Sequence, residues 1–321
     1  MDLSDFPTTA LEFDARFSSE RACWEFLWKA KWPAGFRCPK CGGDKAYYVI
    51  ERKLEECAGC GHQASVTAGT MFHGTRKPLR MWFRAIFEFV SRKYGCNAMD
   101  LKRMLGISYQ TAWEWLHKIR DVFVRRERTK LTGCVEADET YVGGPEAGAS
   151  GRARGERKIL VFGAVEVIEN EEGGTSCGRV RLMPVPSAAA EHLQPALLES
   201  VELGAGVHTD GWMGYREIRH AYAHETTNIR ASGETGSKLF PHIHRVFSLF
   251  KRVLLGTYQG SWSKKYAAMY CEEFTFRFNR RTSHSRVHLF KRVMEQAVKR
   301  RPRLHTLAGR SYENPMVPEP A

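Results

Sequence analysis

The alternation of apolar and polar positions divides the chain into a helical first half and a strand-rich second half. Apolar residues recur at helical spacing over residues 17–32 and 76–95. The same spacing continues over residues 98–105 and 109–123, where two helices are separated by only three residues. The pattern therefore predicts four helices before residue 124.

The last two of these predicted helices have the layout of a helix-turn-helix. The turn between them contains Gly106, and Ser108 stands where it can cap the second helix. In that motif the start of the second helix faces a groove of DNA. The residues expected to do so are Ser108, Tyr109, Gln110, Thr111 and Glu114. An ordinary helical hairpin is the alternative.

The second half is expected to alternate strands with helices. Predicted strands cover residues 131–144, 159–168, 180–185 and 206–212, and a predicted helix separates the last two at 187–201. A long helix then begins at the stretch PHIHRVFSLFKR.

Acidic residues stand at two informative places in these strands. Alternation puts Val135 and Ala137 on one face of the first strand and Glu136 and Asp138 on the other. A buried acid at the centre of a strand must be paired or bind a metal. Asp210 ends the fourth strand. This order of elements and acids is what a ribonuclease-H-like fold requires, in which carboxylates hold two divalent ions for phosphoryl chemistry.

Four of the nine cysteines form two tight pairs with the spacing C-x2-C-x15-C-x2-C. Two such pairs are typical of a zinc ribbon, in which four thiolates bind a structural Zn²⁺ ion. The predicted ligands are Cys38, Cys41, Cys57 and Cys60, and the stretch AYYVI between the pairs is expected to be a strand. The other cysteines show no such spacing, which argues against a disulfide framework.

The charge of the chain indicates a polyanionic partner. Lysine and arginine number 49 against 36 acidic residues, which gives a net charge of +13. Residues 277–303 contain ten basic residues and one acid, so this segment is expected to contact DNA phosphates, through Arg280 and Arg281 among others. With no signal peptide and no long apolar run, the protein is expected to be cytoplasmic and nucleoid-associated, with no membrane contact.

The expected fold class is α+β multidomain, in five parts. A helical segment at 1–35 precedes a zinc ribbon at 36–70. An all-α helix-turn-helix region at 71–128 leads into an α/β ribonuclease-H-like catalytic domain at 129–282. Residues 283–321 are expected to form a basic helix and a disordered tail.

Several blocks in this order resemble bacterial insertion-sequence transposases of the DDE superfamily. They are CPKCGG with CAGCGH, LGISYQTAWEWLHKIR, VEADETYVGG, HTDGWMGY and the long block that begins at SLFKR. The resemblance covers residues 36–281. It implies DNA strand cleavage at transposon ends and transfer into target DNA, with Mg²⁺ or Mn²⁺ as cofactor and at least a dimer on DNA.

The same resemblance assigns roles to four residues. Asp138 and Asp210 match the first two acids of the family. The family's third ligand lies seven residues before a basic residue on one helix, and counting back from Lys251 gives His244. Lys251 would contact the phosphate near the scissile bond. Relatives have N-T-x-E or N-T-x-N before this helix, whereas this chain has PHIH, so His242 competes for the third position.

Two alternatives to an active transposase remain at this stage. One is a catalytically inactive DNA-binding protein, either a decayed transposase or a regulator built from the zinc ribbon and the helix-turn-helix. The other is a ribonuclease-H-type nuclease that does not transfer strands.

Overall fold

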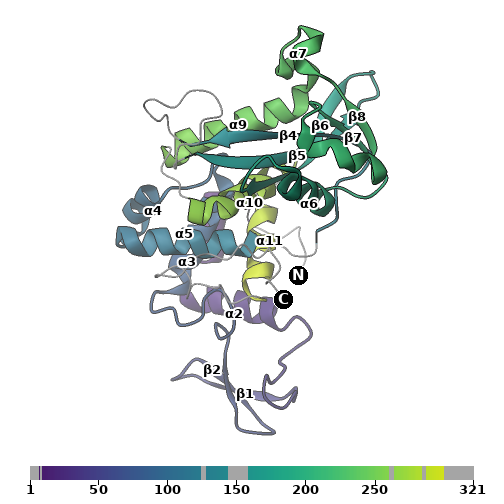
Figure 1. Ribbon diagram of the computed structural model, residues 1–321. Helices are drawn as coiled ribbons and strands as arrows, with labels where there is room; N and C mark the ends of the chain where they lie inside the picture. Colours follow the sequence, from purple (N-terminus) through teal and green to yellow (C-terminus); the bar gives the residue numbers. More distant parts are fainter. Residues whose placement is uncertain are drawn as a thin grey trace. The chain divides into compact units, whose positions relative to one another are not determined.

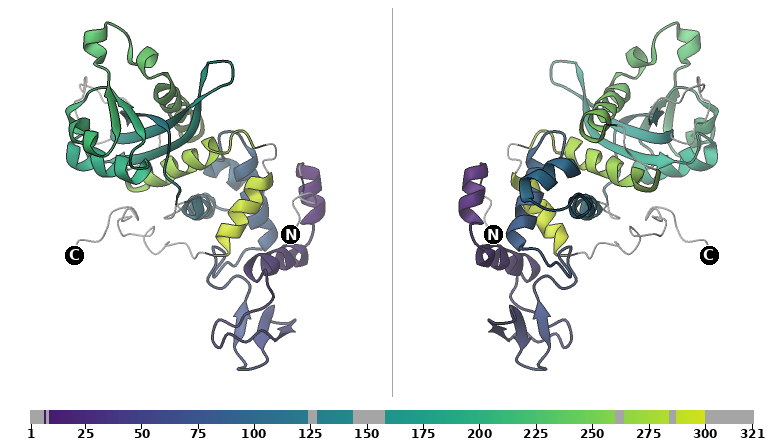
Figure 2. Two further views of the ribbon diagram at one scale, coloured as in Figure 1. Left: turned by 90° about the vertical axis from the view of Figure 1, so that its right-hand side faces the viewer. Right: turned by 90° about the vertical axis from the view of Figure 1, so that its left-hand side faces the viewer.

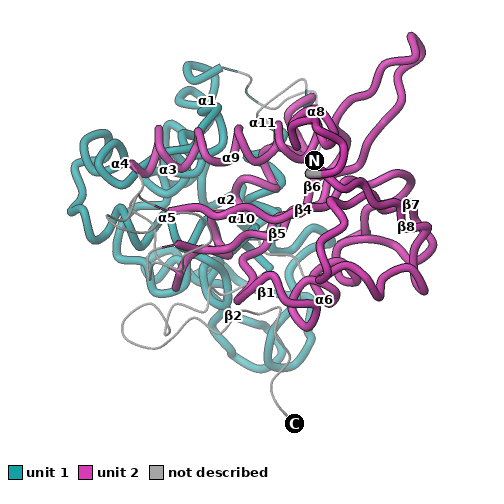
Figure 3. Tube along the Cα trace, turned by 45° about the horizontal axis from the view of Figure 1, so that its top comes forward, with its two compact units in different colours: residues 1–123, 283–309 teal, residues 124–282, 310–321 magenta. Residues whose placement is uncertain are grey.

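The structure is a computed structural model that describes residues 7, 9–123, 128–143, 158–259, 264–283 and 287–299. These residues form two compact units, each with its own core (Figure 3). The first unit is drawn from residues 1–123 and 283–309, and the second from 124–282 and 310–321. The predicted tail beyond residue 299 lies outside the described residues.

An aromatic cluster holds four helices of the first unit together. These helices are α1 (Ala10–Arg16), α2 (Glu20–Lys31), α3 (Leu79–Ser91) and α11 (Val287–Ala297). Phe13 stacks on Phe87 at 4.2 Å between ring centroids, and Phe290 of α11 meets Phe13 at 5.2 Å. Burying several aromatic rings together supplies much of the apolar area that a small unit needs. The C-terminal helix α11 therefore belongs to the core of the N-terminal half.

The cysteine-rich segment forms a small antiparallel sheet below α2 (Figure 2). Its strands are β1 (Ala46–Val49), β2 (Leu54–Cys57) and β3 (Gln63–Ser65), in that order across the sheet. The predicted strand at AYYVI is confirmed. Trp28 of α2 donates a hydrogen bond to Glu55 at 2.8 Å, and Lys31 donates to the carbonyls of Ser65 and Ala68.

The two helices predicted after residue 97 are confirmed with the expected ends, as α4 (Ala98–Leu105) and α5 (Tyr109–Phe123). Gly106 ends α4 with a φ of +63°, a left-handed conformation that glycine adopts without steric penalty. Ser108 Oγ then accepts the amide of Thr111 at 3.1 Å at the start of α5. Trp115 of α5 stacks on Trp82 of α3 at 3.8 Å.

The second unit is built on a five-stranded mixed sheet of order β6-β5-β4-β7-β8. The strands β4 (Cys134–Val142), β5 (Ile159–Glu169) and β6 (Thr175–Val185) are antiparallel neighbours. The strands β7 (Gly206–Thr209) and β8 (Ala223–Thr226) run parallel to β4. The sheet therefore changes from antiparallel to parallel pairing at β4.

Helices cover both faces of this sheet (Figure 1). One face packs against α9 (Pro241–Tyr258) and α10 (Ala267–Phe278), with Val161, Ile243 and Phe250 in the shared core. The other face packs against α6 (Ala190–Ser200) and the 3-10 helix η1 (Met213–His220). Val135 and Ala137 lie in this second core, as the alternation of β4 predicts.

Sequence patterns alone did not indicate every element. The helix α1, the strand β8, the short helices α7 (Ile229–Ser232) and α8 (Gly236–Leu239) and the 3-10 helix η2 (Lys264–Tyr266) were not expected. The strand β6 begins five residues earlier than predicted. Within the described ranges, no helix is both long and apolar enough to span a membrane.

Candidate active site

The two predicted acids lie on neighbouring strands. The parallel register pairs Val135 with Val207 and Glu136 with His208. Continuing this register by two residues aligns Asp138 with Asp210, just after β7 ends. Paired residues of neighbouring strands point to the same face of a sheet. Both carboxylates therefore belong to the face covered by α9.

The helix α9 brings two further predicted residues to this place. His244 Nε2 lies 3.6 Å from Asp138 Oδ2. Lys251 is two helical turns further along the same face of α9, and its charge also acts on Asp138. Asp138, His244 and Lys251, from elements more than 100 residues apart in sequence, therefore lie together.

Residues beside Lys251 extend the site along the helix. A cavity of about 790 Å³ is lined by the end of β4 and by this face of α9. The residues that line it include Asp138, Glu139, His244, Ser248, Lys251 and Arg252. Since α9 contains no acidic residue, the cavity has carboxylates at one end and cations along its side.

Burial and neighbouring charge shape the protonation of this cluster. Burial, together with the charges of Glu139 and Asp210, raises the pKa of Asp138 to about 7. Burial lowers the pKa of His244; the charge of Glu136 opposes this shift and that of Lys251 adds to it. The imidazole is therefore neutral near pH 7, the state in which histidine binds metals.

The competing histidine has another role in the structure. His242 is 8% exposed, and its Nδ1 donates a 2.7 Å hydrogen bond to Glu136 Oε1. The carboxylate of Glu136 also accepts the backbone amides of His242 and Ile243. The acid at the centre of β4 is therefore paired with the start of α9, and His242 faces that acid rather than Asp138.

Asp210 of the site and the neighbouring acid Glu139 also have protein partners. Asp210 Oδ1 accepts the amide of Trp212 at 2.9 Å, and Glu139 Oε2 accepts the hydroxyl of Tyr215 at 3.0 Å. Tyr215 is fully buried, so it is a core residue.

The donor set at this end of the cavity suits a hard divalent cation. The charge of Asp210 contributes to the raised pKa of Asp138, and a bound cation relieves the repulsion between the two carboxylates. Within the described ranges, however, the four cysteines are the only group of three or more His, Cys, Asp or Glu side chains placed to hold one metal ion. Asp138, Asp210 and His244 are therefore neighbours, but their ligand atoms are not all close enough together to form one ligand set.

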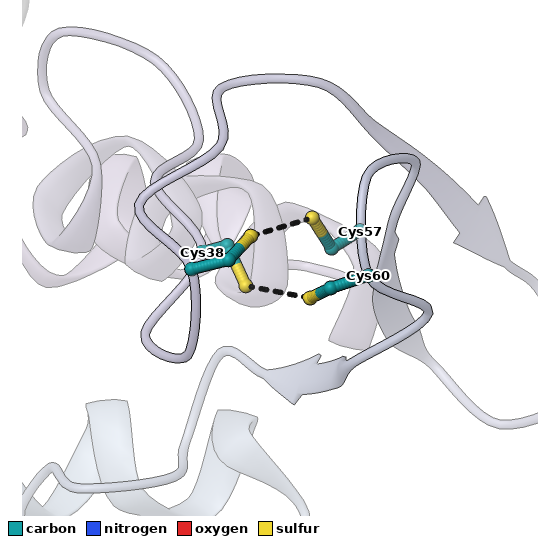
Figure 4. Close-up of side chains that lie close together, drawn as sticks. Cys38, Cys57 and Cys60 are labelled. Atoms are coloured by element: carbon teal, nitrogen blue, oxygen red, sulfur yellow. Dashed lines mark hydrogen bonds between the residues drawn. The ribbon is translucent and has the colours of Figure 1, made fainter.

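The four cysteines form a closed set in the first unit. Their ligand atoms all lie within 4.8 Å of one another, with sulfur–sulfur distances of 3.7 Å for Cys38–Cys60 and 3.5 Å for Cys41–Cys57 (Figure 4). Zinc–sulfur bonds of about 2.3 Å in a tetrahedron place the sulfurs about 3.8 Å apart. The cluster therefore fits structural zinc.

Of the predicted DNA-contacting residues, four are exposed (Ser108, Tyr109, Gln110 and Arg281) and three are half-buried (Thr111, Glu114 and Arg280). Tyr109 is 49% exposed at the start of α5, where Gln110 also donates to Glu114 at 3.0 Å and Ser108 Oγ accepts the amide of Thr111. Arg280 lies over the Phe276 ring at 4.1 Å. The guanidinium of Arg281 donates to the carbonyls of Cys177 and Gly178, which ties α10 to β6.

Comparisons with known proteins agree with this arrangement. Residues 130–279 match the ISXO2-like transposase domain, and residues 18–63 match the transposase zinc-ribbon domain. The chain is also 27% identical over 218 residues to an uncharacterized protein in the transposable element ISH50 of Halobacterium salinarum. That match covers 62% of this chain and 70% of the other protein.

These matches confirm the resemblance to insertion-sequence transposases that was drawn from the motifs. More narrowly, the cysteine-rich segment is similar to the transposase zinc-ribbon domain and the sheet domain is similar to the ISXO2-like transposase domain.

The absence of a side chain at Gly163 allows α9 to approach the site. Gly163 pairs with Asp138 across β4 and β5, and a Cβ atom there would lie 2.5 Å from Phe247 of α9. We expect Gly163→Ala to lower the free energy of unfolding of this unit by about 1–3 kcal/mol, because α9 must shift. Phe247→Leu in the same chain should recover part of that loss in urea denaturation. Additive losses would contradict this contact.

The raised pKa of Asp138 predicts a pH dependence of metal binding. Below about pH 7 the metal-free carboxyl holds a proton that a cation must displace. The affinity for Mn²⁺ should therefore rise about tenfold per pH unit up to about pH 7 and then level off. Calorimetry in buffers of different ionisation heat should detect one proton released at pH 6. His244→Asn should keep the slope, and a flat profile from pH 5.5 to 7 would contradict the prediction.

Proposed function

We propose that this protein is a DDE-type DNA transposase, which cleaves DNA strands at the ends of an insertion sequence and joins them to target DNA. The observation that carries the proposal is the meeting of Asp138, His244 and Lys251 in one cavity, with Asp210 on the neighbouring strand. The sheet order with its change of direction at β4 supports a ribonuclease-H-like catalytic domain.

Asp138, Asp210 and His244 would hold Mg²⁺ or Mn²⁺ in this reaction. A bound divalent ion makes the attacking oxygen more acidic and neutralises charge on the phosphate. The two aspartates supply the negative charge that retains a cation, and the neutral imidazole adds a nitrogen donor.

Lys251 and the cavity would position the DNA. The ammonium group of Lys251 lies beside Asp138, where it can donate to a non-bridging phosphate oxygen and stabilise charge that develops there. Arg252 and Ser248 line the same cavity and offer further donors to the strand. In-line attack by water gives a cut strand, and attack by its 3′-hydroxyl on target DNA gives the joined product.

The first unit would bind DNA without taking part in the chemistry. We assign structural Zn²⁺ to the four cysteines and DNA contact to the helix pair α4–α5, with Tyr109 exposed at the start of α5. Two transposon ends must be held together for transfer, so a homo-oligomer on DNA and a location with the nucleoid follow from this function.

A plasmid excision and integration assay tests the proposal. The cassette would carry the DNA that flanks this gene, and wild type would be run with Asp138→Asn, His244→Asn and Lys251→Ala, each in Mg²⁺ and in Mn²⁺. We expect excision and integration with wild type and loss of both with the aspartate and histidine variants. Binding of the ends by an inert wild type would instead indicate a DNA-binding protein without catalysis. Cutting without joining would indicate a nuclease.

A further inference from the structure

The carboxylate of Glu136 forms the cap of the helix that carries His244. Its Oε2 accepts the amides of His242 at 3.0 Å and Ile243 at 2.9 Å, and its Oε1 accepts His242 Nδ1 at 2.7 Å. Glu136 is 5% exposed, so these three donors replace the hydrogen bonds that water would make to its carboxylate. A buried carboxylate without such partners would be strongly destabilising.

The helix has no cap of its own. Its N-cap residue is Phe240, which provides no side-chain hydrogen bond, and Pro241 follows at the first turn. The first amides of a helix lack partners within the helix, and an acidic group at that end is favourable. Here the partner comes from β4, more than 100 residues earlier in the chain.

The cap and the candidate metal ligands are two residues apart on each element, and on the helix this spacing turns the second side chain by about 200° from the first. Asp138 follows Glu136 by two residues, which keeps both side chains on one face of β4. His244 follows His242 by two residues on α9. Fixing the start of α9 on Glu136 therefore fixes where His244 stands relative to Asp138, at 3.6 Å in this structure.

Close contacts at two glycines restrict the position of α9. Gly163 lets Phe247 pack directly on the sheet beside Asp138. A Cβ atom on Gly236 of α8 would lie 2.8 Å from His244 Nε2, so the imidazole is enclosed from that side. The cap sets the position along the helix axis, while these contacts set the distance from the sheet.

We propose that Glu136 is a positioning residue, which aligns α9 through its hydrogen-bonded cap so that His244 stands beside Asp138. It acts through His244 and touches neither substrate nor cation. The inference rests on the proposed function for its effect on cleavage, whereas the alignment itself is a property of the chain without DNA or metal.

Two substitutions of Glu136 distinguish the effect of side-chain length from the effect of charge. Glu136→Asp keeps the charge but shortens the side chain by one methylene, so it cannot meet the amides without moving α9. Glu136→Gln keeps the length and one acceptor oxygen for the two amides, and its amide group can donate to His242 Nδ1 when the other ring nitrogen holds the proton. Glu166→Asp is the matched control, because Glu166 is a buried acid of the adjacent strand that binds the amides of Thr132 and Arg179 instead.

The test is made on the full zinc-loaded chain with two readouts. Single-turnover cleavage of a duplex that spans the element's end gives the rate and the half-saturating DNA concentration. Amide hydrogen exchange at His242 and Ile243, without DNA or divalent ion, gives the state of the cap. We expect Glu136→Asp to lower the rate about 10²-fold, as a misplacement of about 1 Å does. The half-saturating DNA concentration should stay within about threefold of the wild-type value. The amides of His242 and Ile243 should exchange faster than in wild type.

The pattern across variants decides the proposal. Glu136→Gln should restore slow exchange and most of the rate lost in Glu136→Asp, and Glu166→Asp should leave both readouts near wild type at a similar loss of thermal stability. Equal rate losses in Glu136→Asp and Glu166→Asp would overturn the inference, as would unchanged exchange in Glu136→Asp. If wild type does not cleave, the exchange data alone still judge the cap, and only the proposed function fails.

Discussion

Replacing Asp138 with asparagine is expected to remove strand cleavage and at the same time to stabilise the metal-free protein. Asparagine keeps the oxygen that accepts the amide of Glu139 at 2.7 Å but cannot carry the charge that retains a cation. A catalytic metal ion stabilises the transition state by several kcal/mol. Without it, the rate of strand cleavage should fall about 10³-fold or more.

The gain in stability follows from the direction of the pKa shift. The pKa of Asp138 is raised from 3.8 to about 7 in the folded state. A raised carboxyl pKa makes a destabilising contribution that grows as pH rises from about 4 to about 7 and is constant above that. At about 1.4 kcal/mol per pKa unit, removing it at pH 8 adds at most about 4 kcal/mol.

Urea denaturation from pH 4 to 8 with a chelator for Mg²⁺ and Mn²⁺ would measure this effect. The difference between Asp138→Asn and wild type should be largest at pH 8 and shrink toward zero near pH 4, so the low-pH points serve as the internal control. A variant that is less stable than wild type at pH 8 would show that Asp138 supports the fold rather than straining it.

Removing zinc is expected to unfold the cysteine-rich sheet while the second unit stays folded. The strands β1 to β3 have only three or four residues each, and Tyr47 and Ile50 are 71% and 77% exposed. Such a sheet buries too little apolar surface to fold by itself. Zinc binding by four thiolates is worth about 10–16 kcal/mol in comparable small domains.

Hydrogen exchange with mass spectrometry before and after chelation would show this change. Residues 36–65 should lose protection on zinc removal, and β4 to β6 should keep it because they share the separate core of the second unit. Cys57→Ser should have the same effect as chelation, while Cys134→Ser, an exposed thiol outside the cluster, should not. Protection that survives verified loss of zinc would contradict the role assigned to the ion.

Sequence patterns were sufficient to predict the features that are determined within a single segment of the chain. The ends of α4 and α5 follow from helical spacing around Gly106, and the faces of β4 follow from alternation at Val135 and Ala137. The four cysteines follow from their spacing. In each case a neighbour in sequence determines the outcome, so no knowledge of distant contacts is needed.

Partners that are distant in sequence could not be predicted in this way. Alternation showed that Glu136 must be paired or bind metal, but its partner lies more than 100 residues later. For the same reason His242 and His244 could not be distinguished until the start of α9 was placed on Glu136. The partner of Glu139, the hydroxyl of Tyr215, likewise gave no signal in the sequence. Glu272 and Glu273 are buried and paired with Arg128 and Arg277.

Electron paramagnetic resonance of Mn²⁺ tests the central claim most directly, because it reports the cation at the site without requiring DNA or knowledge of the terminal repeat. The full zinc-loaded chain would be titrated at pH 7.5 beside Asp138→Asn, Asp210→Asn and His244→Asn, with Glu166→Gln as a control. We predict a bound Mn²⁺ in wild type and in the control that each of the three site variants weakens. Equal Mn²⁺ binding by wild type and all three site variants would contradict the assignment of Asp138, Asp210 and His244 as one metal site.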